Sequence, residues 1–170
     1  MNSILKVSTT LVCVLALSAC GDKFGGFGKK PGDVTPSGGI QQGSLDDPTS
    51  VAYFQQTIGD RVLFAVDQSS LSPEATAVLD GQANWLNQNT QYNVTVEGHA
   101  DEQGTREYNL ALGARRASAA KNYLVSRGVA ENRVNTLTFG KERPLEICST
   151  EACWSKNRRA ETAINAGLGS

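Results

Sequence analysis

The sequence is short of the residues that most enzyme chemistry requires. It has one histidine, His99, and four cysteines among 170 residues, with no nucleophile motif and no pair of acids with a second base. General acid–base catalysis needs several such groups close together. We therefore expect a binding protein with no catalytic residue, no cofactor and no metal.

The sequence also lacks an excess of charge of either sign. Sixteen lysines and arginines stand against seventeen aspartates and glutamates, for a formal net charge of -1. No overall basic field exists to collect nucleic acid, so nucleic acid is not an expected partner. An anionic ligand would have to be held by a few placed arginines and backbone N–H groups.

No apolar run is long enough to cross a membrane, which takes roughly 20 residues. The short apolar stretch at residues 11–17 follows Lys6 and precedes small residues, which is the layout of a signal peptide. Residues 17–20, Leu-Ser-Ala-Cys, resemble the lipobox of bacterial lipoproteins. The resemblance implies removal of residues 1–19 and acylation of Cys20. The alternative is an ordinary secretory signal with an unrelated cysteine at the cleavage site.

The residue after the cysteine bears on the destination of such a lipoprotein. An aspartate directly after the cysteine retains lipoproteins of this kind in the inner membrane, whereas here Gly21 follows Cys20 and Asp22 comes one position later. The resemblance therefore implies anchoring in the outer membrane, with the rest of the chain in the periplasm. Three acyl chains would make that anchoring effectively permanent.

Residues 20–48 predict a flexible tether after the anchor. The stretch is rich in glycine and shows no apolar periodicity, so it cannot bury enough surface to offset the entropy of ordering. The alternative, a loop packed on the domain, stays open for residues 45–54. Residues 49–170 are then the single folded domain.

Apolar periodicity in the domain predicts an α/β fold. Helical spacing follows the helix start Ser72-Pro73-Glu74, and alternation at residues 92–96 indicates a strand that ends at Gly98. We expect strands over residues 61–66, 92–98, 134–139 and 160–165, and helices over about 73–86 and 106–127, with a loop before the last strand. The order β-α-β-α-β-β predicts a two-layer domain in which helices cover one face of a mixed sheet.

A polar loop at residues 98–105 connects the central strand to the long helix. Such a junction favours an anion, because N–H groups at the helix start have no partner in the helix. On that helix Asn109, Leu112 and Arg116 stand at i, i+3 and i+7, which places them on one face. A polar, apolar and basic row of this kind is unusual for a purely structural helix.

Four motifs in order identify a family. They are Val-Thr-Val-Glu-Gly-His-Ala-Asp at residues 94–101, Tyr-Asn-Leu-Ala-Leu-Gly-Ala-Arg-Arg-Ala at 108–117, Phe-Gly-Lys-Glu-Arg-Pro at 139–144 and Ser-Lys-Asn-Arg-Arg-Ala at 155–160. Together they resemble the OmpA-like peptidoglycan-binding domains and, among these, the peptidoglycan-associated lipoproteins. The similarity spans about residues 62–164.

The resemblance implies roles for particular residues. In OmpA-like domains the positions of Asp101 and Arg116 grip the diaminopimelate of the cell-wall peptide, and Asn109 and Leu112 would line the pocket. Asp67 resembles the family's aspartate at the end of the first strand. An aspartate can pair with the ammonium group of the ligand, and an arginine can fork onto its carboxylate.

The same resemblance implies a function. It is non-covalent attachment of the outer membrane to peptidoglycan within the Tol-Pal system, with the Tol periplasmic propeller protein as a competing partner and a role in envelope integrity and cell division. One alternative is a peptidoglycan-processing enzyme, whose zinc version would need His99, Cys148, Cys153 and another ligand together. Another is a wall-binding stator, which would need a retained transmembrane helix.

Several residues keep two interpretations from the sequence alone. Asp101 and Arg116 could form an internal ion pair without a ligand, and His99 could be a structural residue. Arg158 and Arg159 could be a solvated face or a contact to glycan or a partner.

Cys148 and Cys153 predict first a local disulfide and second half of a metal site. They lie in a loop where many relatives lack cysteine. Trp85 and Trp154 indicate packing in the core or in a groove.

Overall fold

The computed structural model describes residues 43–166. The predicted signal peptide at residues 1–19, Cys20 and all but the end of the predicted tether lie outside the described residues. Within the described range, no helix has the length and apolar character needed to cross a membrane.

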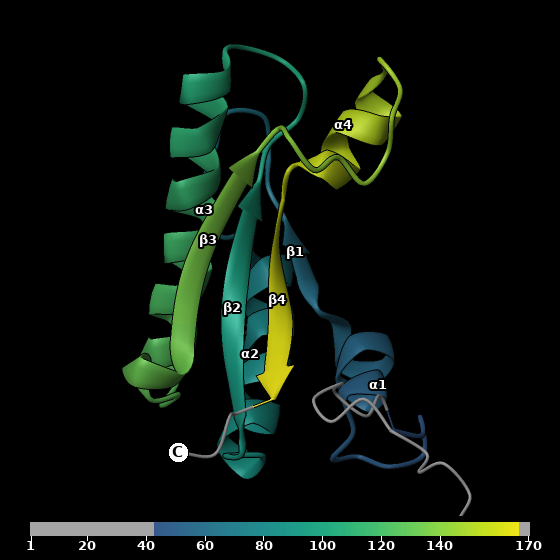
Figure 1. Cartoon of the computed structure of the whole chain (residues 1–170), viewed down its shortest axis with the longest axis vertical. Helices are drawn as coiled ribbons and strands as arrows, with labels where there is room; N and C mark the ends of the chain where they lie inside the picture. The colour runs from purple at the N-terminus through teal and green to yellow at the C-terminus, as the bar shows by residue number, and fades with distance from the viewer. Residues whose placement is uncertain (1–42, 167–170) are drawn as a thin grey trace, which may run out of the picture. The chain divides into compact units, whose positions relative to one another are not determined.

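Helices and strands alternate along the described chain (Figure 1). In order they are α1 (Val51–Tyr53), the π-helix η1 (Phe54–Gly59), β1 (Arg61–Leu63), α2 (Pro73–Gln88), β2 (Tyr92–His99), α3 (Arg106–Ser126), the 3-10 helix η2 (Glu131–Arg133), β3 (Val134–Gly140), α4 (Glu151–Asn157) and β4 (Arg159–Ala166).

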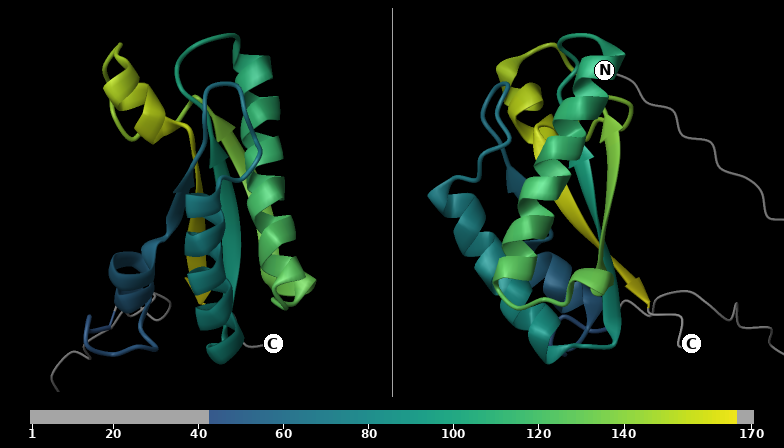
Figure 2. Two further views of the ribbon diagram at one scale, coloured as in Figure 1. Left: turned by 180° about the vertical axis from the view of Figure 1, so that it is seen from behind. Right: turned by 90° about the vertical axis from the view of Figure 1, so that its left-hand side faces the viewer.

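The sheet has the strand order β1-β4-β2-β3. The central strand β2 pairs in parallel with β3 and antiparallel with β4, and β4 pairs antiparallel with β1. Figure 2 shows α2 and α3 on the same face of this sheet. The expected two-layer α/β fold with a mixed sheet is therefore confirmed.

The core lies between the sheet and these two helices. Val94 and Val96 on β2 belong to one cluster with Leu79 and Leu86 of α2 and Leu124 of α3, and all five are almost completely buried. Every residue of the core cluster lies between Val51 and Ile164. A chain that starts after Cys20 therefore keeps every residue of this cluster, and we expect it to fold by itself.

Two glycines set how closely α3 approaches β2. A Cβ atom on Gly98 would lie 1.8 Å from the carbonyl oxygen of Gly113, and one on Gly113 would lie 2.5 Å from Oγ1 of Thr138. The helix backbone thus rests directly on the sheet. This contact places the first turns of α3 beside the carboxyl end of β2, where the predicted site residues meet.

All four strands differ at an end from the sequence predictions, by one residue in β2, β3 and β4 and by three residues in β1. β1 ends at Leu63, whereas the apolar run predicted a strand to residue 66, because the chain turns there with Gln68 N–H donating to the Ala65 carbonyl at 3.2 Å. β2 continues to His99, one residue past Gly98, with a register shift against β3 at that point.

Helical segments replace two stretches predicted as irregular. α4 occupies the predicted loop, and α1 with η1 precedes β1. All three segments are short, and the side chain of Thr150, the residue before α4, makes no capping bond. Segments of this length carry too few turns for a periodic apolar pattern, and tertiary contacts stabilise them instead.

Candidate functional site

A pocket of about 230 Å³ opens where β1 and β2 end and α3 begins. Eight residues line it: Val66, Asp67, Asp101, Gln103, Gly104, Tyr108, Asn109 and Leu112. Four of the five predicted ligand-binding residues are among them, and Arg116 is not. The structure therefore gathers Asp67, Asp101, Asn109 and Leu112 around one cavity.

Three segments form its walls. They are the strap, defined here as residues 64–68 after β1, the loop of residues 100–105 after β2, and the first turns of α3. Thr105 caps α3 by accepting the Tyr108 N–H at 3.2 Å. The Asn109 side chain donates to the Gln103 carbonyl at 2.7 Å, and Lys141 donates to the Gly104 carbonyl at 2.7 Å. These bonds give the loop a defined shape.

Asp101 lies at the base of the loop and is 8% exposed. Its Oδ1 accepts the Gln103 N–H at 3.2 Å, and its Oδ2 lies 3.2 Å from Nη1 of Arg158. Asp101 thus has an ion-pair partner inside the protein, but that partner is Arg158. The internal pair with Arg116 considered from the sequence is absent among residues 43–166.

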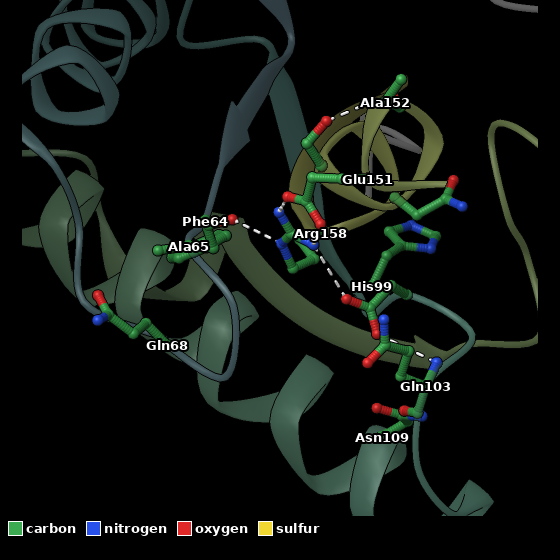
Figure 3. A network of polar contacts seen from close by, with 12 residues as sticks. Phe64, Ala65, Gln68, His99, Gln103, Asn109, Glu151, Ala152 and Arg158 are labelled. Atoms are coloured by element: carbon green, nitrogen blue, oxygen red, sulfur yellow. Dashed lines mark hydrogen bonds and ion pairs between the residues drawn. The ribbon is translucent and has the colours of Figure 1, made fainter. Parts of the chain in front are cut away.

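Arg158 connects three parts of the site (Figure 3). Besides Asp101, it contacts the carbonyl of Phe64 on the strap, with Nε donating at 3.2 Å, and both carboxylate oxygens of Glu151 on α4. The hydrogen bond from Arg158 lowers the pKa of Glu151, and the same bond raises the pKa of Arg158. Arg158 is 4% exposed and Arg159 is 5% exposed, so neither is a solvated face.

Arg116 is fully buried behind the pocket. Its Nε donates to the Gln68 carbonyl at 2.8 Å, Nη1 to the His99 carbonyl at 2.8 Å and Nη2 to the Ala65 carbonyl at 3.2 Å. Burial lowers its pKa to about 10, while nearby Asp101 opposes that shift. Arg116 therefore stays charged at neutral pH and ties the strap to the end of β2.

Asp67 combines an unusual backbone with an exposed carboxylate. Its φ of 59° is the one positive φ at a residue other than glycine in the described range, a conformation that costs on the order of 1 kcal/mol. The Tyr108 hydroxyl donates to its Oδ1 and holds the side chain over the pocket. The strap thus presents a second carboxylate opposite Asp101.

His99 contributes to the site through its backbone. Its ring is 1% exposed, it stacks on Phe139 at 5.4 Å, and neither ring nitrogen has a hydrogen-bond partner among the described residues. Burial, followed by the charge of Arg159, lowers its pKa to about 4. The ring is therefore neutral at pH 7, and its role is structural.

The cysteines do not form a metal site with His99. Cys148 and Cys153 are joined in a disulfide with their Cα atoms 5.9 Å apart, so neither offers a thiolate to a metal. The described part of the chain also contains no cluster of three or more metal-ligating side chains. The zinc-dependent alternative has no ligand set there.

Sequence reasoning missed several residues of the site. Val66, Gln103, Gly104 and Tyr108 line the pocket, and Glu151 with Arg158 holds Asp101. Tyr108 and Arg158 both lie inside the family motifs, so the motifs could have indicated them as site residues. No pattern in the sequence pointed to Glu151. Its partner is Arg158, seven positions later, and the short helix α4 lies between the two charged groups.

Comparisons with known sequences identify relatives over nearly the full chain. Residues 63–158 match the OmpA family. The peptidoglycan-associated lipoprotein of Mesorhizobium japonicum is 48% identical over 164 residues, covering 96% of this chain and 94% of that protein. The peptidoglycan-associated lipoprotein of Haemophilus influenzae is 37% identical and covers 96% of this chain and 99% of that protein.

Solved structures show the same architecture. The crystal structure of the peptidoglycan-associated lipoprotein from Burkholderia pseudomallei aligns with a TM-score of 0.63 at 35% identity, covering 71% of this chain and 98% of that one. The C-terminal domain of Helicobacter pylori MotB aligns with a TM-score of 0.60 at 18% identity, covering 64% and 86% of the two chains. The second likeness shows the fold alone.

Proposed function

Since the chain belongs to the OmpA family, we propose that its pocket binds peptidoglycan without covalent attachment, through the diaminopimelate of the stem peptide. The observation that carries the proposal is the pocket itself. Two carboxylates, Asp67 and Asp101, face one cavity at the end of the central strand, with the charged Arg116 behind it.

The family also settles the class of activity. The chain is a homologue of the peptidoglycan-associated lipoproteins, which are non-enzymatic members of the OmpA family. It is therefore a binding protein and not an enzyme.

The ligand chemistry follows from the charges. Diaminopimelate ends in an ammonium and a carboxylate on one carbon, so a site for it needs both signs of charge. Asp101 and Asp67 suit the ammonium group. Arg116 suits the carboxylate, with three of its N–H groups used on backbone carbonyls out of the five that a guanidinium has. Because Arg116 is fully buried, its charge acts through space unless the strap moves.

The anchor and the partners complete the proposal. Acylated Cys20 would fix the chain in the outer membrane, and residues 20–48 would let the domain reach the wall from the periplasmic side. The support is the Leu-Ser-Ala-Cys sequence at residues 17–20 and the word lipoprotein in the names of the relatives. The chain would then act in the Tol-Pal system, with the Tol periplasmic propeller protein as a partner, in envelope integrity and cell division.

Sedimentation with purified peptidoglycan tests the wall-binding step. We compare an unlipidated chain beginning at Gly21 with its Asp101→Asn and Asp46→Asn variants. Asp46 is exposed and lies outside the pocket, so its variant removes the same charge elsewhere. We expect wild type and Asp46→Asn to pellet, and Asp101→Asn to bind more weakly by about 2 kcal/mol, roughly 30-fold.

Thermal unfolding of all three proteins verifies that they are folded. Equal pelleting of the three would show that Asp101 is outside the binding site. Failure of the folded wild type to pellet would contradict the proposed function itself.

A further inference from the structure

Asp101 shares its arginine partner with a second carboxylate. Arg158 gives one N–H to Asp101, at 3.2 Å, and contacts Glu151 with both terminal nitrogens. Asp101 and the guanidinium of Arg158 are buried, whereas the Glu151 side chain is 62% exposed. The stronger pairing of Arg158 therefore points away from the pocket, toward a residue that does not line it.

This division of the arginine's charge has a consequence for a cationic ligand. An arginine can pair with one carboxylate through two parallel N–H groups. Without Glu151, both terminal nitrogens of Arg158 would be free to turn onto Asp101 and neutralise it. With Glu151 in place, Asp101 keeps lone pairs available on the side that faces the pocket.

We infer that Glu151 is a positioning residue for ligand binding, acting on Asp101 through Arg158, and that the Cys148–Cys153 disulfide holds it in place. This inference rests on the proposed function, because it concerns the affinity of the same pocket. Glu151 does not line the cavity, so the contact that connects it to the site is the one through Arg158.

The structure shows why the disulfide matters for Glu151. Glu151 is the first residue of α4, a helix of seven residues, and Thr150 before it makes no side-chain capping bond. A helix this short is marginal without external ties. The disulfide joins Cys148, before the helix, to Cys153 in its first turn, and so encloses Glu151.

The other end of α4 has its own anchor. The buried Asn157 accepts the N–H groups of Leu145 and Glu146 at 2.8 and 3.0 Å and donates to the Glu146 carbonyl at 2.9 Å. These bonds fix the C-terminal end of the helix to the segment that precedes it. The disulfide is the covalent tie at the end that carries Glu151.

Affinity for purified diaminopimelate-containing peptidoglycan, measured with the chain beginning at Gly21, tests the inference. We expect Glu151→Gln to weaken binding by roughly threefold to tenfold, and Glu151→Asp, which keeps the charge, to restore much of it. Glu146→Gln is the matched control. It removes the same charge from the same segment, but Glu146 pairs with Lys156, so its affinity should equal that of wild type.

The disulfide is tested with a dithiol reductant. Exchange converts the bond into two thiols while the reductant becomes a disulfide. Reduced wild type and the double variant Cys148→Ser with Cys153→Ser should bind as weakly as Glu151→Gln. In the Glu151→Gln background, reduction should change affinity little further, because both changes act on the same pair.

The outcomes separate this inference from the proposed function. If wild type pellets and Glu151→Gln binds equally well, the positioning role is wrong and wall binding stands. Independent losses from reduction and from Glu151→Gln would mean that the disulfide acts by another route. If folded wild type does not bind peptidoglycan, both proposals fail together.

Discussion

Arg116 and Arg158 are both buried cations that bind backbone carbonyls of the strap. Arg116 bonds to the carbonyls of Ala65 and Gln68, and Arg158 bonds to that of Phe64. Burying a guanidinium is costly unless its N–H groups are satisfied. Each arginine therefore fixes the strap while it sets the charge beside the pocket, so substituting Arg116 would test folding and binding at once. Asp101→Asn keeps the shape of the side chain and removes only its charge, so it tests the effect of that charge on binding.

The buried imidazole of His99 gives a pH-dependent prediction. Its pKa falls from 6.5 to about 4 in the folded protein because burial disfavours the charged ring. Between these two pH values the unfolded chain therefore binds more protons than the folded chain. The contribution of His99 to the free energy of unfolding is fully present above pH 6.5 and is lost progressively as the pH falls toward 4. The loss is at most about 3 kcal/mol.

Replacement of His99 by phenylalanine removes this loss. The variant keeps a ring to stack on Phe139 and removes two ring nitrogens that have no hydrogen-bond partner in the described range. Urea unfolding of both proteins from pH 4 to 7 measures the difference. Glu97, whose Oε2 lies 3.9 Å from Nε2 of His99, is the carboxylate next to the substituted ring, so Glu97→Gln in both backgrounds is the control. If the free energy of unfolding depends on pH in the same way for wild type and His99→Phe, the assignment of a neutral, buried imidazole is wrong.

At the scale of elements, the contact between β2 and α3 positions the site. Gly98 and Gly113 have no room for a methyl group, since a Cβ on either would approach backbone or side-chain atoms to 2.5 Å or less. We expect Gly98→Ala or Gly113→Ala to push the helix off the sheet and lower the free energy of unfolding by about 3 kcal/mol. Denaturant unfolding measures this.

Gly81→Ala on α2 is the matched control. Its Cβ would meet Cγ2 of Ile58 at 3.2 Å, the end of a side chain that can adjust, and alanine favours a helix over glycine by about 1 kcal/mol. Its stability should stay within about 1 kcal/mol of wild type. A similar loss in all three variants would show that the close approach of α3 to β2 is not special.

The sequence predicted elements whose apolar pattern runs over several residues. α2, β2, α3, β3 and β4 all fall where periodicity or alternation placed them, because each buries one face against the core. It did not predict η1 or α4, which are short and depend on contacts such as those of Asn157. It also extended β1 into the strap, since an apolar run does not reveal a turn at Asp67.

At the scale of the whole molecule, the two-layer fold brings distant segments to one cavity. The strap follows the first strand, the loop follows the central strand, and Arg158 lies between α4 and the last strand. Four pocket residues could be predicted because two of the motifs and the end of the first strand contain them. The pairing of Asp101 with Arg158 could not, because these residues are 57 positions apart and Arg115, Arg116 and Arg159 were equally available in the sequence.

The most direct measurement is an NMR titration. The isotopically labelled chain that begins at Gly21 is titrated with a soluble stem peptide containing diaminopimelate, and the shifts of its amide signals are recorded. We expect saturable shifts at Gln103, Gly104 and Asn109, which line the pocket, and weaker binding of the same peptide with lysine in place of diaminopimelate, because lysine lacks the second carboxylate. Shifts confined to residues outside the pocket, or equal affinity for the two peptides, would contradict recognition of the zwitterionic end group at this site.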